Sequence, residues 1–212
     1  MTPGPRPAAG SARYPSAVPP LQSKVIVSPM AAEPKTVVVP EPGAADEYVF
    51  PVAKNPDPLL PITSYQGKTR TLDDWATVFN IMLIVLPDRP EAAGFIPVID
   101  RIFTTFGDSD VRTVVCVPST KTITKRILGN AVDRWLTWID PDRALIDSLG
   151  LERLPALLLL RQDTSLFTVA QGWSPTEWQK TTNEIARKEH WSTPIVTGRG
   201  DPAPTPGWPV AS

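Results

Sequence analysis

The chain has 212 residues, and its 21 Lys and Arg against 22 Asp and Glu leave no basic surplus of the kind that nucleic-acid-binding domains carry. One cysteine, Cys116, excludes an internal disulfide, and with the single histidine, His190, it cannot supply the three or four ligands of a zinc site. Because there is neither an apolar run of about 18 residues nor a signal-peptide core, we expect a cytoplasmic protein without a membrane span. We also expect no nucleic-acid partner, no metal and no cofactor.

The first part of the chain is rich in proline. The sequence has 26 prolines, and roughly half of them precede Ile62, whereas the average share in proteins is about 5%. Short apolar clusters such as Val37–Val39 are too small to build a core. We predict that residues 1–61 form a disordered Pro-rich tail, and Met30 is an alternative start of the native protein.

A polar turn around Gly67 opens the folded domain, which we place at residues 64–190. The following residues predict a short helix in which Trp75 and Phe79, four residues apart, share the buried face. The continuous apolar run from Ile81 to Leu86 is typical of a strand that is buried on both faces in a parallel sheet.

Helix and strand patterns then alternate. Helical apolar spacing predicts a helix over residues 91–106, with Pro97 inside it as a kink. Further segments are predicted as a strand over 111–117, a helix over 121–135, a strand over 136–139 and a helix that Asp140-Pro141 opens and Gly150 closes. This order predicts an α/β fold with right-handed crossovers.

The last third of the pattern adds antiparallel strands and one helix. Residues 157–160 and 165–170 are predicted to form a hairpin, so the sheet is expected to be mixed. Ser174-Pro175 followed by Glu177 has the capping-box spacing that starts the final helix. Proline and glycine return after it, so residues 192–212 are predicted to form a second tail, whose Trp208 either packs on the domain or stays in solvent.

The order of these elements resembles the thioredoxin-like fold. Gly150, the segment Leu154-Pro155 before a buried strand and Gly172 after the last strand match landmarks of that family, and the opening Gln66-Gly67-Lys68 resembles its redoxin branch of thiol-disulfide oxidoreductases and peroxiredoxin-like proteins. The resemblance covers roughly residues 64–188. It implies a mixed sheet flanked by helices and a cis peptide bond at Leu154-Pro155 that faces the active site.

The resemblance also places the family's Cys-x-x-Cys motif. In thioredoxins a proline follows the second cysteine by five residues, and counting back from Pro97 puts Arg89-Pro90-Glu91-Ala92 on the motif. Both cysteines are therefore missing, and we predict no catalytic residue. The residues that would line the former active site, now a candidate binding groove, are Asp88, Arg89, Pro90, Glu91, Ala92, Leu154 and Pro155.

The groove of this family holds an extended peptide through backbone hydrogen bonds, which need no cysteine. Our leading hypothesis is thus a non-catalytic protein that binds a protein or peptide partner in the former active-site groove. One alternative is a thiol-dependent oxidoreductase or peroxidase acting through Cys116, although a cysteine within an apolar strand is expected to be buried and inert. Another alternative is partner binding by the Pro-rich tail. Arg89 and Glu91 are expected to form a solvated ion pair, with anion binding by Arg89 as the alternative.

Overall fold

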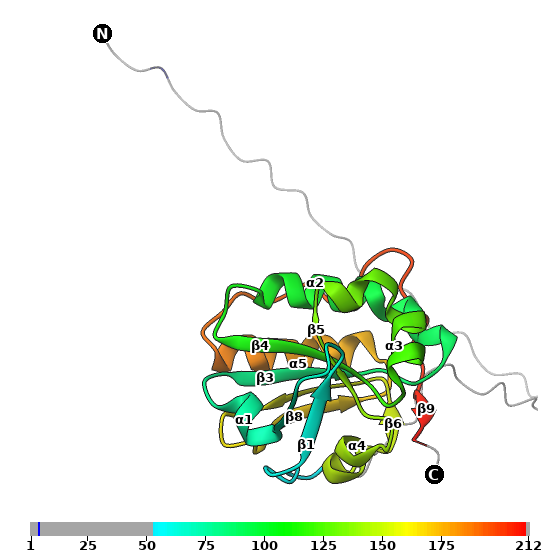
Figure 1. The fold of residues 1–212 in the computed structure, drawn as a ribbon. Helices are drawn as coiled ribbons and strands as arrows, with labels where there is room; N and C mark the ends of the chain where they lie inside the picture. Colours follow the sequence, from blue (N-terminus) through cyan, green and yellow to red (C-terminus); the bar gives the residue numbers. More distant parts are fainter. Residues whose placement is uncertain (1–3, 5–52, 211–212) are drawn as a thin grey trace, which may run out of the picture. The chain divides into compact units, whose positions relative to one another are not determined.

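The computed structural model describes residue 4 and residues 53–210, and the fold is that of the second range. A seven-stranded sheet lies at its centre, in the order β2-β1-β5-β4-β3-β7-β8 (Figure 1). Its strands are β1 (Pro61–Ser64), β2 (Thr69–Thr71), β3 (Asn80–Val85), β4 (Val111–Val117), β5 (Leu136–Ile139), β7 (Ala156–Leu160) and β8 (Leu166–Gln171). Strands β3, β4 and β5 run parallel, whereas β7 and β8 add antiparallel neighbours, so the predicted mixed sheet is confirmed.

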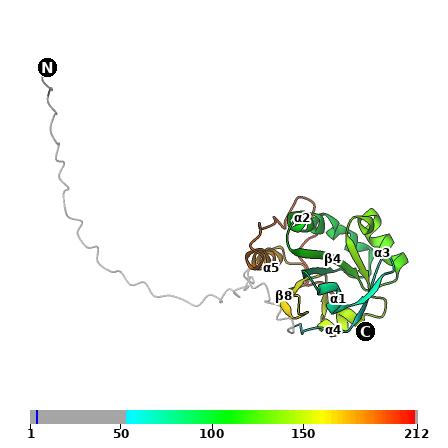
Figure 2. The ribbon, with the colours of Figure 1, turned by 60° about the vertical axis from the view of Figure 1, so that its left-hand side comes forward.

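Helices cover both faces of this sheet (Figure 2). They are α1 (Leu72–Ala76), α2 (Ile96–Phe106), α3 (Lys121–Leu128), α4 (Ala144–Leu149) and α5 (Pro175–Lys188), with 3-10 turns η1 (Pro90–Phe95) and η2 (Gly129–Asp133). Alternate residues of β3 point to opposite faces: Met82 and Ile84 pack with α2, α3 and α5, whereas Ile81 and Leu83 pack with α1 and α4. All four side chains are fully buried, as the continuous apolar run predicts.

Several helix boundaries differ from the sequence-based prediction. Pro97 does not kink a long helix, because α2 begins at Ile96 and Pro97 lies in its first turn, where the missing N–H breaks no helical hydrogen bond. The third helix ends at Leu128 and continues only as the 3-10 turn η2. Trp75 is buried on α1 as predicted, but α1 ends at Ala76 and leaves Phe79 half-buried outside the helix.

The residue pair Asp140-Pro141 also acts differently from the prediction. Helix α4 begins only at Ala144, so Pro141 is not its first residue. The carboxylate of Asp140 nevertheless accepts hydrogen bonds from the backbone N–H groups of Leu145 at 3.1 Å and Ile146 at 3.3 Å. Asp140 therefore satisfies free amides of the first turn from a position outside the helix.

The folded region extends beyond both predicted boundaries. At its start, Ala53 is buried, and the N–H of Lys54 donates to the carbonyl of Leu149 at 2.8 Å. Residues 53–61 of the predicted N-terminal tail are thus described, and β1 begins at the last of them, Pro61, whereas residues 1–3 and 5–52 lie outside the described residues. At the other end, residues 191–210 pack against the domain and carry the short strand β9 (Trp208–Pro209). We call residues 191–210 the C-terminal segment.

The C-terminal segment is held at several points along its course. It leaves the end of α5 and passes beside α2 (Figure 2). Val196 is fully buried, and its carbonyl accepts hydrogen bonds from the Arg101 side chain of α2 at 2.7 and 3.2 Å. Arg101 also pairs with Asp201, whose side chain is only 9% exposed. The prediction of a loose tail failed because buried side chains and specific hydrogen bonds outweigh the Pro- and Gly-rich composition.

Candidate binding groove at the former active-site position

The residues that were predicted to occupy the Cys-x-x-Cys positions, Arg89 to Ala92, follow the central strand β3 at the point where η1 begins. Arg89 is the N-cap of η1 with extended backbone, and Pro90 is its first residue. Ala92 is fully buried, whereas Pro90 and Glu91 are exposed. The carboxylate of Asp88 lies 3.7 Å from the guanidinium of Arg143, which precedes α4. None of these side chains carries a thiol, so the arrangement supplies no thiol chemistry.

The Leu154-Pro155 segment lies between strands β6 (Arg153–Leu154) and β7, and its peptide bond is cis. Both residues are buried, with Leu154 only 4% exposed. The side-chain carbonyl of Gln171 accepts from the N–H groups of Glu152 at 2.7 Å and Arg153 at 3.0 Å. These bonds fix the backbone of β6 from the side of the main sheet.

The outer edge of β6 pairs with the C-terminal segment. Strand β9 runs antiparallel to β6, with Leu154 opposite Trp208 and Arg153 opposite Pro209, and the two strands lie side by side in Figure 1. The N–H of Val210 donates to the carbonyl of Glu152 at 2.9 Å. An extended peptide therefore already lies along this edge, and it belongs to the same chain.

Trp208 joins the two halves of the predicted groove. Its ring lies edge-on to Phe95 of η1, with centroids 6.4 Å apart, and the guanidinium of Arg89 stacks over it at 5.3 Å. The same residue is opposite Leu154 in the β6–β9 pair. Arg89 and Leu154 thus meet through Trp208, and Arg89 forms no ion pair with Glu91 among the described residues.

Two glycines allow the C-terminal segment to approach this closely. A Cβ atom on Gly207 would lie 2.5 Å from the carbonyl oxygen of Leu154, and one on Gly172 would lie 2.7 Å from the carbonyl oxygen of Pro206. Both glycines also have positive φ angles, of 81° and 73°. Any larger residue at either position would push the segment away from β6.

Hydrogen bonds and aromatic contacts continue upstream of β9. Trp173 and Thr205 exchange two backbone hydrogen bonds of 2.8 and 2.9 Å. The indole N–H of Trp173 donates to the carbonyl of Pro202 at 2.8 Å, and its ring lies edge-on to Phe95 at 5.6 Å. The Arg89 Nε atom, by contrast, is buried without a hydrogen-bond partner among the described residues.

Cys116 lies away from the groove, in the middle of β4. It is fully buried among the side chains that face α1 and α4, and it is opposite Val85 and Trp138 in the sheet. Burial raises the pKa of the Cys116 thiol well above its ordinary value, and the nearby Asp140 carboxylate raises it further. Cys116 therefore has neither the access nor the charge of a reactive thiolate.

Asp140 is a buried acid that interacts electrostatically with this thiol. Burial raises the pKa of the Asp140 carboxyl, and the hydrogen bonds from the α4 amides partly oppose that rise.

Within residues 53–210, no cluster of His, Cys, Asp and Glu side chains is placed to hold a metal ion. No helix in this part of the chain is long and apolar enough to cross a bilayer.

Arg89 and Leu154 were predicted to line one groove, but the sequence did not indicate that residues 205–210 lie in it. Trp208, Gly207, Trp173 and Phe95 surround or occupy the groove. Of the two alternatives that the sequence left open for Trp208, the structure shows the packed one, against Phe95 and Arg89. The available signal was the run Gly207-Trp208-Pro209, in which a large aromatic residue interrupts a polar, Pro-rich end. Composition alone gives no reason to place that tryptophan next to Arg89.

No family model and no curated protein sequence matches this chain. Solved structures do match its fold. A candidate DsbE-type thiol:disulfide interchange protein from Chlorobium tepidum aligns with a TM-score of 0.54 at 12% identity, covering 64% of this chain and 96% of its own.

Two further solved structures also align with this chain. DsbF of MTB aligns with a TM-score of 0.51 at 14% identity, covering 60% of this chain and 96% of its own. The thioredoxin domain of a thiol-disulfide oxidoreductase from Bacteroides vulgatus gives 0.51 at 10% identity, with coverage of 65% and 97%. At such identities the likeness shows the fold alone. The chain has the thioredoxin-like fold of thiol-disulfide oxidoreductases, without their Cys-x-x-Cys pair.

Proposed function

We propose that this chain is a redox-inactive thioredoxin-like protein that binds an extended peptide or protein segment in the groove between Arg89 and Leu154. The observation that carries the proposal is the antiparallel pairing of β9 with β6. It supports the proposal because the outer edge of β6 accepts an extended chain by strand addition, a recurrent mode of peptide recognition.

The absence of a usable thiol supports the non-catalytic part of the proposal. Thiol-disulfide exchange requires an attacking thiolate and access to the partner disulfide. The positions of the missing cysteines carry Arg89 and Ala92. The single cysteine, Cys116, is buried in β4, and the pKa of its thiol is raised. Neither condition is met at the groove.

The side chains at the groove support recognition of a peptide with an aromatic residue. Arg89 offers a guanidinium face that stacks on an indole, and Phe95 offers the edge-to-face contact on the adjoining side. Asp88, Glu91 and Arg143 add exposed or half-exposed charges around this aromatic position. A partner is therefore expected to contribute both backbone pairing and an aromatic anchor.

Site-specific photo-cross-linking in cells tests the binding role. A photoreactive residue at the exposed Glu91 position, beside the groove, should give a covalent adduct with a partner, and Arg89→Ala should reduce that adduct several-fold. The matched control carries the photoreactive residue at Lys180, whose side chain is 67% exposed on α5 away from the groove. Identical adducts from both positions, or an adduct at 91 that ignores Arg89→Ala, would contradict the proposal.

The alternative of an enzyme acting through Cys116 is tested separately. We expect the purified chain to show no insulin reduction and no peroxide consumption above the Cys116→Ser variant, because that thiol is buried. Activity in the native chain that Cys116→Ser abolishes would establish the oxidoreductase instead. This assay does not depend on whether a binding partner has been found.

A further inference from the structure

The groove that we propose for a partner is already filled by the chain itself. Residues Thr205 to Val210 pair with Trp173 and with β6, and Trp208 lies between Arg89 and Phe95. The position is the one that an incoming extended peptide would need. A partner and this end of the chain therefore exclude each other.

We infer that residues 205–210 are an intramolecular ligand that closes the groove, and that the external partner is an extended peptide of the same Gly-aromatic-Pro chemistry, which must displace them. The inference rests on the proposed function, since it concerns the same groove. It adds the control of access and the kind of peptide that gains access.

The contacts of residues 207–209 define what such a peptide must contain. The first position requires glycine, because a Cβ atom there would overlap the Leu154 carbonyl oxygen at 2.5 Å and the Gly172 Cα at 2.9 Å. The second position takes an aromatic ring that stacks under Arg89. The third position tolerates proline, which has no N–H group. The hydrogen bond that β9 donates to Glu152 comes from the N–H of Val210 and not from residue 209.

The unpartnered Arg89 Nε atom gives an external peptide its advantage. This buried N–H makes no hydrogen bond to the C-terminal segment or to any other described residue. A buried donor without a partner is unfavourable, so a peptide with a carbonyl or carboxylate oxygen at this point gains a bond that residues 205–210 do not make. Such a peptide can compete for the groove with residues 205–210, although these residues are tethered to the domain.

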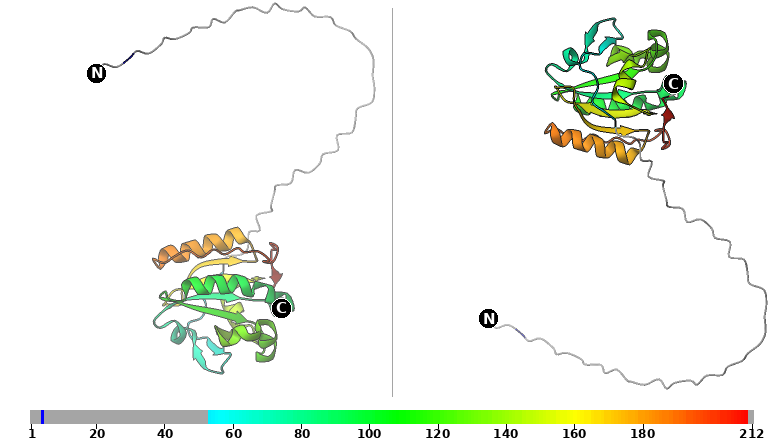
Figure 3. Two further views of the ribbon diagram at one scale, coloured as in Figure 1. Left: turned by 90° about the horizontal axis from the view of Figure 1, so that it is seen from above. Right: turned by 90° about the horizontal axis from the view of Figure 1, so that it is seen from below.

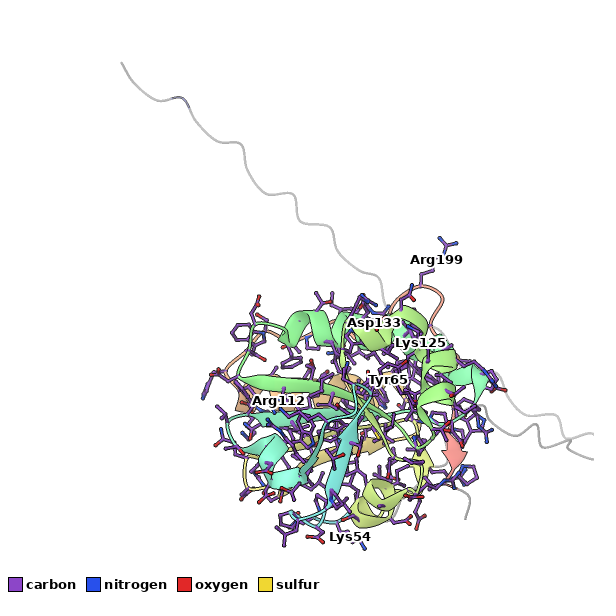
Figure 4. The ribbon with its side chains drawn as sticks, in the orientation of Figure 1. Lys54, Tyr65, Arg112, Lys125, Asp133 and Arg199 are labelled. Carbon is purple, nitrogen blue, oxygen red and sulfur yellow. The ribbon has the colours of Figure 1, made fainter. Side chains whose placement is uncertain are left out.

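The upstream part of the C-terminal segment need not move when residues 205–210 leave. Val196 is fully buried, and Asp201 is fixed by Arg101 of α2. The turn between these two anchors carries Arg199, which points into solvent in Figure 4. Release therefore involves only the last residues and leaves them tethered beside the groove.

Tethering sets the size of the expected effect. A short tether gives an effective concentration of about 1 mM. For an external peptide that binds the open groove at about 10 µM, the closed chain then binds about 100-fold more weakly. The difference between closed and open chains is thus large enough to measure by titration.

The experiment uses full-length chains and a fluorescein-labelled peptide with the sequence of residues 205–212, followed by fluorescence anisotropy. Gly207→Val should expel the chain's own segment, because its side chain overlaps Leu154 and Gly172. The matched control is Gly200→Val, since Gly200 has a similar φ of 88° but open space at its Cβ position. Trp208→Ala serves as a second opening variant, and amide hydrogen exchange in β3 and β4 verifies that every variant is folded.

We expect the peptide to bind Gly207→Val and Trp208→Ala at least about tenfold, and up to about 100-fold, more tightly than the native chain or Gly200→Val. A peptide carrying Trp208→Ala should lose this binding. Exchange at residues 205–210 should rise in the two opening variants only.

Equal peptide affinity for all four chains, or loss of protection at residues 205–210 without any gain of peptide binding, would overturn the inference. A native dimer joined by exchanged C-terminal segments, detected by light scattering, would overturn it too. If the peptide binds the opened groove but cells yield no cross-linked partner at position 91, the proposed function fails and the intramolecular contact stands.

Discussion

Replacing Gly172 with alanine tests how closely the C-terminal segment packs against the domain. A Cβ atom at Gly172 would lie 2.7 Å from the carbonyl oxygen and 2.8 Å from the carbonyl carbon of Pro206, both in the backbone. The φ angle of 73° adds left-handed strain of about 1–2 kcal/mol for an alanine. The native arrangement therefore cannot persist unchanged.

The protein can relieve the overlap by releasing residues 205–210. The loss in the free energy of unfolding is therefore limited to the free energy that these residues contribute to the folded state. Their backbone hydrogen bonds include two with Trp173 and one from Val210 to Glu152, at about 1 kcal/mol each, and Trp208 contacts Phe95 and Arg89 at about 1 kcal/mol each. Regained conformational entropy offsets part of this loss. We expect Gly172→Ala to lower the free energy of unfolding by about 2–4 kcal/mol.

Urea unfolding of Gly172→Ala and Gly67→Ala gives the comparison. Gly67 has a φ of 92° and nothing within 4 Å of its Cβ position, so the same exchange there should cost only the left-handed strain of about 1–2 kcal/mol. Hydrogen exchange at Thr205 and Val210 should rise in the Gly172 variant alone. Equal losses of stability in the two variants would refute the reasoning, because backbone strain would then account for the whole effect.

Three further predictions concern the thiol, the buried acid and the domain boundaries. Because the Cys116 thiol is buried and its pKa is raised, it should react with an aromatic disulfide reagent at least about tenfold more slowly in native than in urea-unfolded protein; comparable rates would contradict its burial. Because the folded-state pKa of Asp140 lies above its unfolded value, the protonated carboxyl favours folding at low pH, and this contribution is lost as pH rises from about 3.8 through the folded pKa. Urea unfolding across this range should therefore show the native chain losing stability relative to Asp140→Asn as pH rises; the opposite slope would contradict the shift. Limited proteolysis should leave a fragment that begins near residue 53 and retains Val196, whereas a fragment ending near residue 190 would contradict the packing of the C-terminal segment.

The central elements were predictable because their signals are local. The apolar run that became β3 is long enough to indicate burial on both faces, and the Ser174–Glu177 pattern does place its serine at the N-cap of α5, where its hydroxyl accepts from Glu177 N–H at 3.3 Å. Gly172 and Leu154-Pro155 gave the alignment with the thioredoxin-like fold. Counting back from Pro97 then placed Arg89 at the first Cys-x-x-Cys position, beside the groove.

The contacts of the C-terminal segment were not predictable from local pattern. Its residues pair with partners far away in the sequence, as Arg153 does with Pro209, and no periodic apolar pattern marks them. The role of Asp140 was also missed in part. Its carboxylate accepts from amides of α4 that lie five and six residues ahead, because α4 does not begin directly after Asp140. Such interactions depend on the path of the folded chain.

The packing on the two faces of the sheet explains why the fold needs no cysteine at positions 89–92. Positions 89–92 lie at the start of η1, where Ala92 and Phe95 pack into the core shared with α2 and α5. Figure 3 shows α5, in orange, running along the yellow strands of the sheet. Cys116 belongs to the opposite core, with α1 and α4. Packing therefore holds the groove in place without any contribution from redox chemistry.

The central claim is that the former active-site groove binds an extended peptide without thiol chemistry. Its most direct test is NMR chemical-shift mapping of the residue 205–212 peptide on ¹⁵N-labelled Gly207→Val chain in which Cys116 is replaced by serine. We expect saturable shifts at Arg89, Phe95, Arg153 and Leu154, the residues that contact or pair with the native segment. Shifts confined to α5, or binding that requires the Cys116 thiol, would contradict it.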